Sequence, residues 1–144
     1  MKVLSTVVLL SGLIVSSFAQ ASQLPNDALN SYQLLRSIFA KYDITKGDGP
    51  NDAPCKLTLI LQEKQVYLGL EKAPGAALLD GVFTTLDMAS AERVVVGSYG
   101  WDGEQTDFII DRAPEALTVK AINIASERAG GGAEVAYCTF YPKK

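Results

Sequence analysis

From Cys55 onward, apolar and polar residues alternate along most of the chain. A period of two places successive side chains on opposite faces of an extended strand, so this pattern predicts strands with one buried face. The connections between them are mostly of hairpin length, which makes neighbouring strands antiparallel. We expect seven strands, over residues 55–62, 65–71, 81–87, 92–99, 105–111, 116–124 and 133–141.

The alternation also predicts which side chains face the core. In the strand over 116–124, Val119 and Ala121 fit the inward series, whereas Ile122 and Ile124 are out of phase with it, which predicts a β-bulge near Ala121. In the first, second and last strands the predicted inward residues are Cys55, Leu57, Leu59, Leu61, Val66, Leu68, Leu70, Ala136, Cys138 and Phe140.

Residues 27–42 have the period of a helix instead. Asn26 or Asp27 can cap it, and its other face is polar, so one stripe should be buried on the sheet. Residues 43–54, rich in Gly, Pro, Asn and Asp, then form an irregular connection. The apolar stripe consists of Leu29, Tyr32, Leu35, Ile38, Phe39 and Tyr42.

The N-terminus is typical of an export signal. A basic start precedes an apolar run over residues 3–15, and Ala19-Gln20-Ala21 has the small-x-small pattern of a signal-peptidase site. We expect cleavage after Ala21, which leaves one β-rich domain over residues 22–144 in the periplasm or extracellular space. The run is shorter than the roughly 20 apolar residues that span a bilayer, so we expect no membrane span.

The chain has two cysteines, Cys55 and Cys138, 83 positions apart. In an oxidising compartment, an even count with this spacing favours one structural disulfide over a C-x-x-C redox pair. Closing so long a loop removes about 4 to 5 kcal/mol of unfolded-state freedom in the loop-entropy description. The bond would join the first predicted strand to the last, so the sheet must close. We therefore predict a small antiparallel β-barrel or strongly curled sheet with the helix packed on it.

Closure would bring several apolar side chains together on the outer face. With the first, second and last strands as neighbours, Ile60, Tyr67, Tyr137 and Tyr141 would form an outward apolar patch. We expect the amphipathic helix to cover it; the alternative is an exposed patch that binds a partner.

Composition excludes several classes of function. The chain of 144 residues suits one domain, and it contains no His, which excludes His-dependent acid–base catalysis and the commonest transition-metal ligand. Cleavage after Ala21 would remove Lys2 alone among the charged residues, making the net charge one unit more negative than −3. Nucleic acid and anionic membrane surfaces are therefore poor partners. The sequence has no phosphate loop or dinucleotide fingerprint, so it predicts no cofactor.

Two loops are candidate binding sites. Tyr99, Trp101 and Asp102 lie at a predicted hairpin tip, where an aromatic side chain offers a large contact area at a small ordering cost. The alternative is that Trp101 folds back over the open end of the sheet. Gly130 and Gly131 lie in a glycine loop that could form an anion-binding nest or simply connect two strands.

Two groups of carboxylates are weaker candidates. Asp43, Asp48 and Asp52 lack the spacing of a calcium loop, and side-chain-capped turns are expected instead, so we predict no metal site. Asp107 and Asp111 could form a hydrolase pair, but the alternation places them on a solvated outer face.

These features favour a non-enzymatic binding module that recognises a protein or cell-envelope component through its loops. Inhibition of a hydrolase is one form that such binding could take. The alternative is a carrier that holds a small apolar ligand inside the barrel. A hydrolase that uses carboxylates ranks third.

Overall fold

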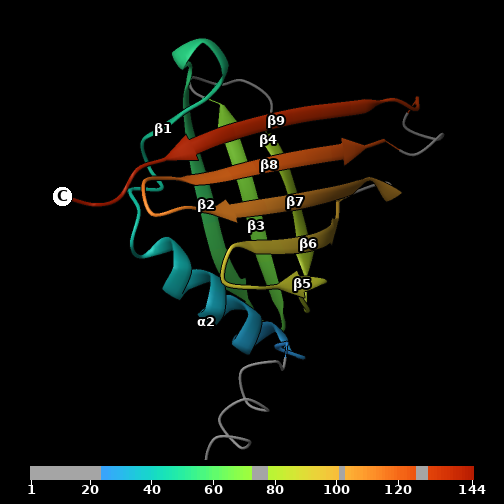
Figure 1. The fold of residues 1–144 in the computed structure, drawn as a ribbon. Helices are drawn as coiled ribbons and strands as arrows, with labels where there is room; N and C mark the ends of the chain where they lie inside the picture. The colour runs from blue at the N-terminus through green and yellow to red at the C-terminus, as the bar shows by residue number, and fades with distance from the viewer. Residues whose placement is uncertain (1–23, 73–77, 101–102, 126–129) are drawn as a thin grey trace, which may run out of the picture.

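The computed structural model describes residues 24–72, 78–100, 103–125 and 130–144. The expected signal segment and its cleavage site lie outside these residues. The described chain is mainly β: nine antiparallel strands form one sheet that curls into a ring (Figure 1). The strands are β1 (Gly47–Asp48), β2 (Pro54–Gln62), β3 (Gln65–Lys72), β4 (Leu78–Phe83), β5 (Met88–Ala89), β6 (Arg93–Tyr99), β7 (Gln105–Arg112), β8 (Leu117–Ile124) and β9 (Ala133–Phe140).

All seven predicted strands are present. The largest error is at β4, which occupies Leu78–Phe83 where 81–87 was expected. Thr84 and Thr85 leave the sheet after β4, which explains why they interrupt the alternation. Two short strands were not predicted: β1 lies in the expected irregular connection, which also holds a 3-10 turn at Pro50–Asp52, and β5 lies in the expected connection before β6.

The ring closes at two seams. At the first, β1 lies between β2 and β9, with Gly47 paired to Cys55 and Asp48 paired to Thr139. The predicted disulfide between Cys55 and Cys138 joins the two strands there, with a Cα–Cα distance of 6.1 Å. At the second, β4 and β6 meet through the single pair Val82–Tyr99. In Figure 1, β6–β9 run across the front and β2–β4 run steeply behind them.

The inward side chains form one buried cluster. Phe108 and Phe140 are its largest fully buried members. The predicted inward residues of β3 and β9 are buried as expected, and in β2 Cys55 and Leu57 are buried while Leu59 and Leu61 are partly so.

The predicted bulge near Ala121 is wrong. β8 pairs with β9 without interruption, and Ile122 lies opposite Val135 while Ile124 lies opposite Ala133. Both isoleucines are therefore on the outer face, and Ile124 is 49% exposed. The apolar–polar alternation breaks at these positions because two apolar residues face outward, while the strand itself stays regular.

The helix α2 (Ala28–Phe39) begins as predicted at Asp27, whose Oδ1 accepts a hydrogen bond from the Asn30 backbone N–H at 2.7 Å. One predicted buried residue is wrong: Leu29 is 51% exposed, and Ser31 is buried in the helix interface instead. Ser31 shares a face with Ala28 and Leu35 at spacings of three and four, whereas Leu29 is rotated away from that stripe.

The helix does not cover the outward patch. It packs beside β2 and β3, and its buried side chains Leu35, Ile38 and Phe39 join the inward cluster (Figure 1). Ile60, Tyr137 and Tyr141 remain 40%, 46% and 49% exposed. The prediction failed because the open end of the ring, and not its outer face, offers the apolar surface that matches the helix.

The disulfide indicates an oxidising environment outside the cytosol. Among the described residues, no helix has the length and apolar character needed to cross a membrane.

Candidate functional site

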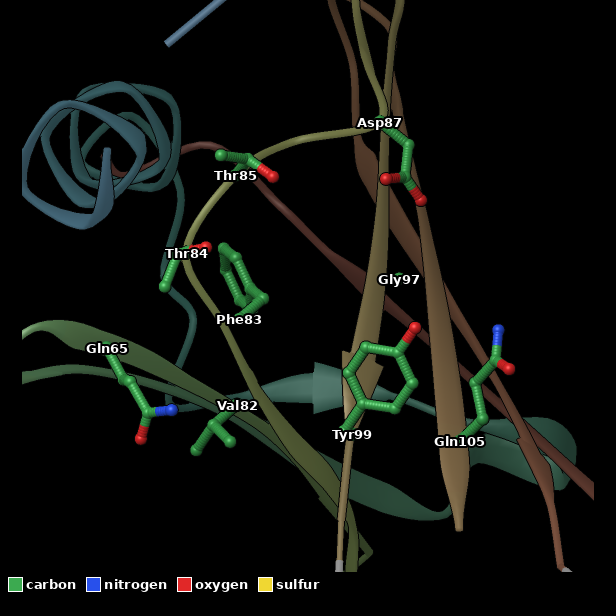
Figure 2. Close-up of a pocket in the computed structure, with 9 residues that line it drawn as sticks. All are labelled: Gln65, Val82, Phe83, Thr84, Thr85, Asp87, Gly97, Tyr99 and Gln105. Carbon is green, nitrogen blue, oxygen red and sulfur yellow. The ribbon is translucent and has the colours of Figure 1, made fainter. Parts of the chain in front are cut away.

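The clearest candidate site is a pocket of about 380 Å³ on the outer side of the β4–β6 seam (Figure 2). We call it the seam pocket. Its volume lies within the range of about 300 to 1,000 Å³ that is typical of small-molecule sites. It is lined by Gln65, Val82, Phe83, Thr84, Thr85, Asp87, Gly97, Tyr99 and Gln105.

Tyr99 forms one wall of the seam pocket. It is the last residue of β6 and is paired to Val82 across the seam and to Gln105 on β7. Its side chain is 66% exposed, the largest exposure among the large hydrophobic residues of the described chain. Backbone pairing on two sides therefore fixes the position from which this exposed ring extends.

The opposite wall is the segment from Thr84 to Asp87, which three contacts hold in place. The buried Ser31 hydroxyl on α2 donates a hydrogen bond to the Thr84 carbonyl at 2.9 Å. Leu86 is buried in the core, and the Asp87 backbone N–H donates to the Val95 carbonyl at 2.9 Å. The helix therefore positions this wall, although it contributes no side chain to the lining.

The floor of the pocket depends on a glycine. A Cβ atom at Gly97 would lie 2.8 Å from Asp87 Oδ2 and 3.5 Å from Asp107 Oδ1. The missing side chain leaves the space into which the Asp87 carboxylate extends. Gln105 Nε2 donates a hydrogen bond to Asp107 Oδ1 at 3.0 Å, which orients the Gln105 amide at the rim.

The lining is polar and weakly acidic. Asp87 is its one charged residue, beside three hydroxyls and two amides, and the lining includes no Lys or Arg. Such a surface offers both hydrogen-bond donors and acceptors but no positive charge to pair with an anion.

The structure tests the predicted loop residues only in part. Tyr99 lines the seam pocket, whereas Trp101 and Asp102 lie outside the described residues. Gly130 and Gly131 have left-handed backbone angles, with φ of 96° and 67°, and no atom lies within 4 Å of a Cβ built on either.

The glycines share an edge of the sheet with Tyr99 but do not line the pocket. They precede β9, whose first residue Ala133 pairs with Ile124, which pairs with Gln105 next to Tyr99. Three strand spacings separate Ala133 from Tyr99, roughly 14 Å. Only an extended ligand or a macromolecular partner could contact both places at once.

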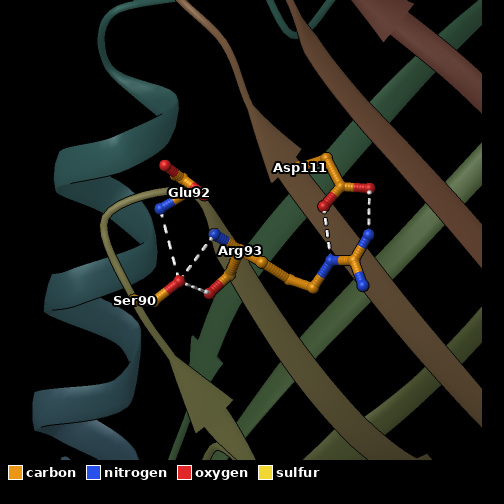
Figure 3. Close-up of polar contacts among 4 residues, drawn as sticks. All are labelled: Ser90, Glu92, Arg93 and Asp111. Atoms are coloured by element: carbon orange, nitrogen blue, oxygen red, sulfur yellow. Dashed lines mark hydrogen bonds and ion pairs between the residues drawn. The ribbon is translucent and has the colours of Figure 1, made fainter.

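The carboxylate candidates mostly have structural partners. Asp111 forms a two-point ion pair with Arg93, whose Nε and Nη2 donate to it at 2.6 and 3.2 Å (Figure 3). The hydrogen bonds that Asp111 accepts from the guanidinium, together with its negative charge, raise the pKa of Arg93 above its ordinary value. The Ser90 hydroxyl orders the preceding turn by accepting from the backbone N–H of Arg93 at 3.0 Å.

Asp43 stabilises a turn, as the sequence predicts. It accepts hydrogen bonds from the Thr45 hydroxyl at 2.7 Å and from the Thr45 backbone N–H at 3.2 Å. These bonds lower the pKa of the Asp43 carboxyl. Within the described parts of the chain, no three acidic or Cys side chains gather in a way that could hold a metal ion.

Sequence reasoning missed most of the seam pocket. Gln65, Thr84, Asp87, Gly97 and Gln105 come from four separate segments that meet only when the ring closes at β4 and β6. The one signal was the pair Thr84-Thr85, which interrupts an otherwise apolar stretch. No known protein family, curated protein or solved structure matches this chain.

Proposed function

We propose that this protein is an exported, non-enzymatic binding module of the periplasm or extracellular space. It recognises a protein or cell-envelope component through the seam pocket and the adjoining edge of the sheet. The observation that carries the proposal is Tyr99, a 66% exposed aromatic side chain on the wall of a preformed pocket. Aromatic anchors of this kind dominate the binding energy of many interfaces.

Co-sedimentation of the oxidised exported protein with envelope fractions tests this proposal. Tyr99→Ala should weaken retention by about tenfold or more, since removing an interface anchor commonly costs at least 1.4 kcal/mol. Tyr137→Ala is the matched control, because Tyr137 is 46% exposed on the outer face of β9, away from the pocket. Equal retention of the two variants would count against the proposal.

A carrier of a small apolar ligand is the second candidate. It is favoured by a separate pocket of about 280 Å³ between α2 and β2, where Tyr32, Phe39 and Leu59 contribute apolar surface. The ligand would then lie beside the helix and not at the centre of the ring. A carrier should release a small molecule on solvent extraction and melt at a lower temperature afterwards. A binding module should show neither change.

A further inference from the structure

The seam pocket has the chemistry of a sugar site. We propose that it binds one pyranose unit of a neutral glycan, with the sugar ring stacked on Tyr99. This inference rests on the proposed function and specifies the ligand class for the same site.

The lining of the seam pocket disfavours anionic and acyl ligands. With no Lys or Arg among its residues and Asp87 at its floor, the pocket opposes phosphates, sulfates and uronic acids. Its polar side chains also make it a poor site for an acyl chain, which needs a mostly apolar lining. With two amides and three hydroxyls against a single carboxylate, the lining favours a neutral polar ligand over a cationic one.

The free hydrogen-bonding groups match a polyol. Among the described residues, no hydrogen bond engages the side chains of Gln65, Thr84, Thr85 or Asp87. Amides and hydroxyls both donate and accept, and the carboxylate accepts. Adjacent hydroxyls of a pyranose also donate and accept, so each could pair with one of these groups without an unsatisfied partner.

Tyr99 supplies the remaining surface that a sugar needs. A pyranose has one face formed by C–H groups, which packs on the flat face of an aromatic ring. Figure 2 shows the Tyr99 ring extending between Val82 and Gln105, with its hydroxyl directed toward Gly97. The Tyr side chain has only two χ angles to order, so stacking costs little conformational freedom.

The pocket is also preformed. Pairing to Val82 and Gln105 fixes the backbone of Tyr99, and the hydrogen bond from Ser31 fixes that of Thr84. Binding therefore requires little reorganisation, which improves affinity for a ligand that makes few contacts.

An NMR titration of the ¹⁵N-labelled, oxidised exported protein tests the inference. The probes are neutral oligosaccharides of glucose, galactose, mannose and N-acetylglucosamine, with trigalacturonate as an anionic probe and trilysine as a basic peptide. At least one neutral oligosaccharide should shift the backbone amides of Gly97 and Tyr99 and the side-chain amide of Gln105. Trigalacturonate should shift none of them.

Three variants locate the site. Tyr99→Ala should weaken binding of that oligosaccharide by about tenfold or more, and Gly97→Val should abolish it by filling the floor. Gly97→Val should fold, because the atom nearest the added Cβ is Asp87 Oδ2, the far end of an exposed side chain and not backbone. Gly100→Ala is the control, since its Cβ would have 3.8 Å of clearance, and its affinity should equal that of the unmodified protein.

The outcomes separate this inference from the proposed function. If trilysine shifts these amides and no neutral oligosaccharide does, the glycan inference is wrong and a basic protein segment is the ligand. If no probe binds but envelope retention still requires Tyr99, the glycan inference fails while the binding module stands. If envelope retention is independent of Tyr99, the proposed function fails, and the titration alone decides whether the pocket binds a glycan.

Discussion

Gly81 shows how closely two strands approach at the seam between β4 and β6. A Cβ atom at Gly81 would lie 2.1 Å from Ser98 Oγ and 2.7 Å from Ser98 Cβ. Ser98 is fully buried and donates a hydrogen bond to the Thr106 carbonyl, so it has no room to move away. Only glycine at position 81 permits this approach.

Gly81→Ala should therefore lower the free energy of unfolding by about 1 to 3 kcal/mol, the usual cost of overpacking a core. Chemical denaturation measures it. The matched variant Gly100→Ala lies at the end of the same seam, where an added Cβ would make only ordinary van der Waals contacts at 3.8 Å or more, and it should change stability by less than about 0.5 kcal/mol. Equal effects of the two substitutions would show that the seam is not closely packed.

Tyr67 carries the one large pKa shift of the described chain. Burial, and then the hydrogen bond that its hydroxyl donates to Asp80 Oδ2 at 3.0 Å, raise the pKa of Tyr67 to about 12 from the ordinary value of 10.0. Because the folded pKa is the higher one, folding stabilises the protonated phenol. That stabilisation is complete below pH 10 and is lost as the pH rises through about 12.

Tyr67→Phe should lower the free energy of unfolding at neutral pH by about 0.5 to 1.5 kcal/mol, the net value of one hydrogen bond. The difference between the two proteins should shrink above about pH 10. Ultraviolet absorbance should detect one tyrosine that ionises near pH 12 in the unmodified protein and is missing from the variant. A stability difference that grows with pH would contradict this account.

Among the elements, the helix α2 gives the sharpest test of packing. The sequence predicts that Leu29 and Leu35 are both buried, whereas the structure buries only Leu35. Leu35 is fully buried and Leu29 is 51% exposed. Leu35→Ala should lower the free energy of unfolding by about 2 to 5 kcal/mol, and Leu29→Ala by less than about 0.5 kcal/mol. Thermal or urea denaturation of the two variants measures this difference. A larger loss of stability in Leu29→Ala than in Leu35→Ala would contradict this interpretation.

The same element shows how far sequence could predict this fold. Local patterns suffice where one face is simply buried, as in β3, where Val66, Leu68 and Leu70 alternate and are all buried. They fail where an apolar residue faces solvent, as for Ile124, or where a polar one is buried, as for Ser31. Ser31 is in the interface because it bonds to the distant Thr84 carbonyl, and no local pattern records such a partner.

In the whole molecule, the disulfide fixes one of the two closures of the ring. The disulfide could be predicted because an oxidising compartment and an even cysteine count leave one pairing, and closure at β1 then follows. Closure between β4 and β6 could not be predicted from the sequence, since it rests on a single pair of residues and on the glycine at position 81. The seam pocket forms at this second closure, so only Tyr99 among its residues was predicted.

Reducing the disulfide should lower the free energy of unfolding by about 2 to 5 kcal/mol. The two cysteines are 83 positions apart, and the unfolded chain between them regains conformational entropy when the bond is broken. Urea denaturation with and without a reductant measures it, and Cys55→Ser/Cys138→Ser should match the reduced protein. An unchanged midpoint would mean that the other contacts at β1 already fix this closure.

On the function proposed here, the protein binds its partner through the seam pocket. Hydrogen–deuterium exchange of the oxidised protein over residues 22–144, with and without an envelope fraction that retains it, tests this proposal. We predict slower exchange in the segments that contain Thr84–Asp87 and Gly97–Tyr99, with no change over Val135–Tyr137 on the outer face of β9. Protection confined to β9, with the seam segments unchanged, would contradict the claim and move the binding surface to the exposed apolar face of β8 and β9.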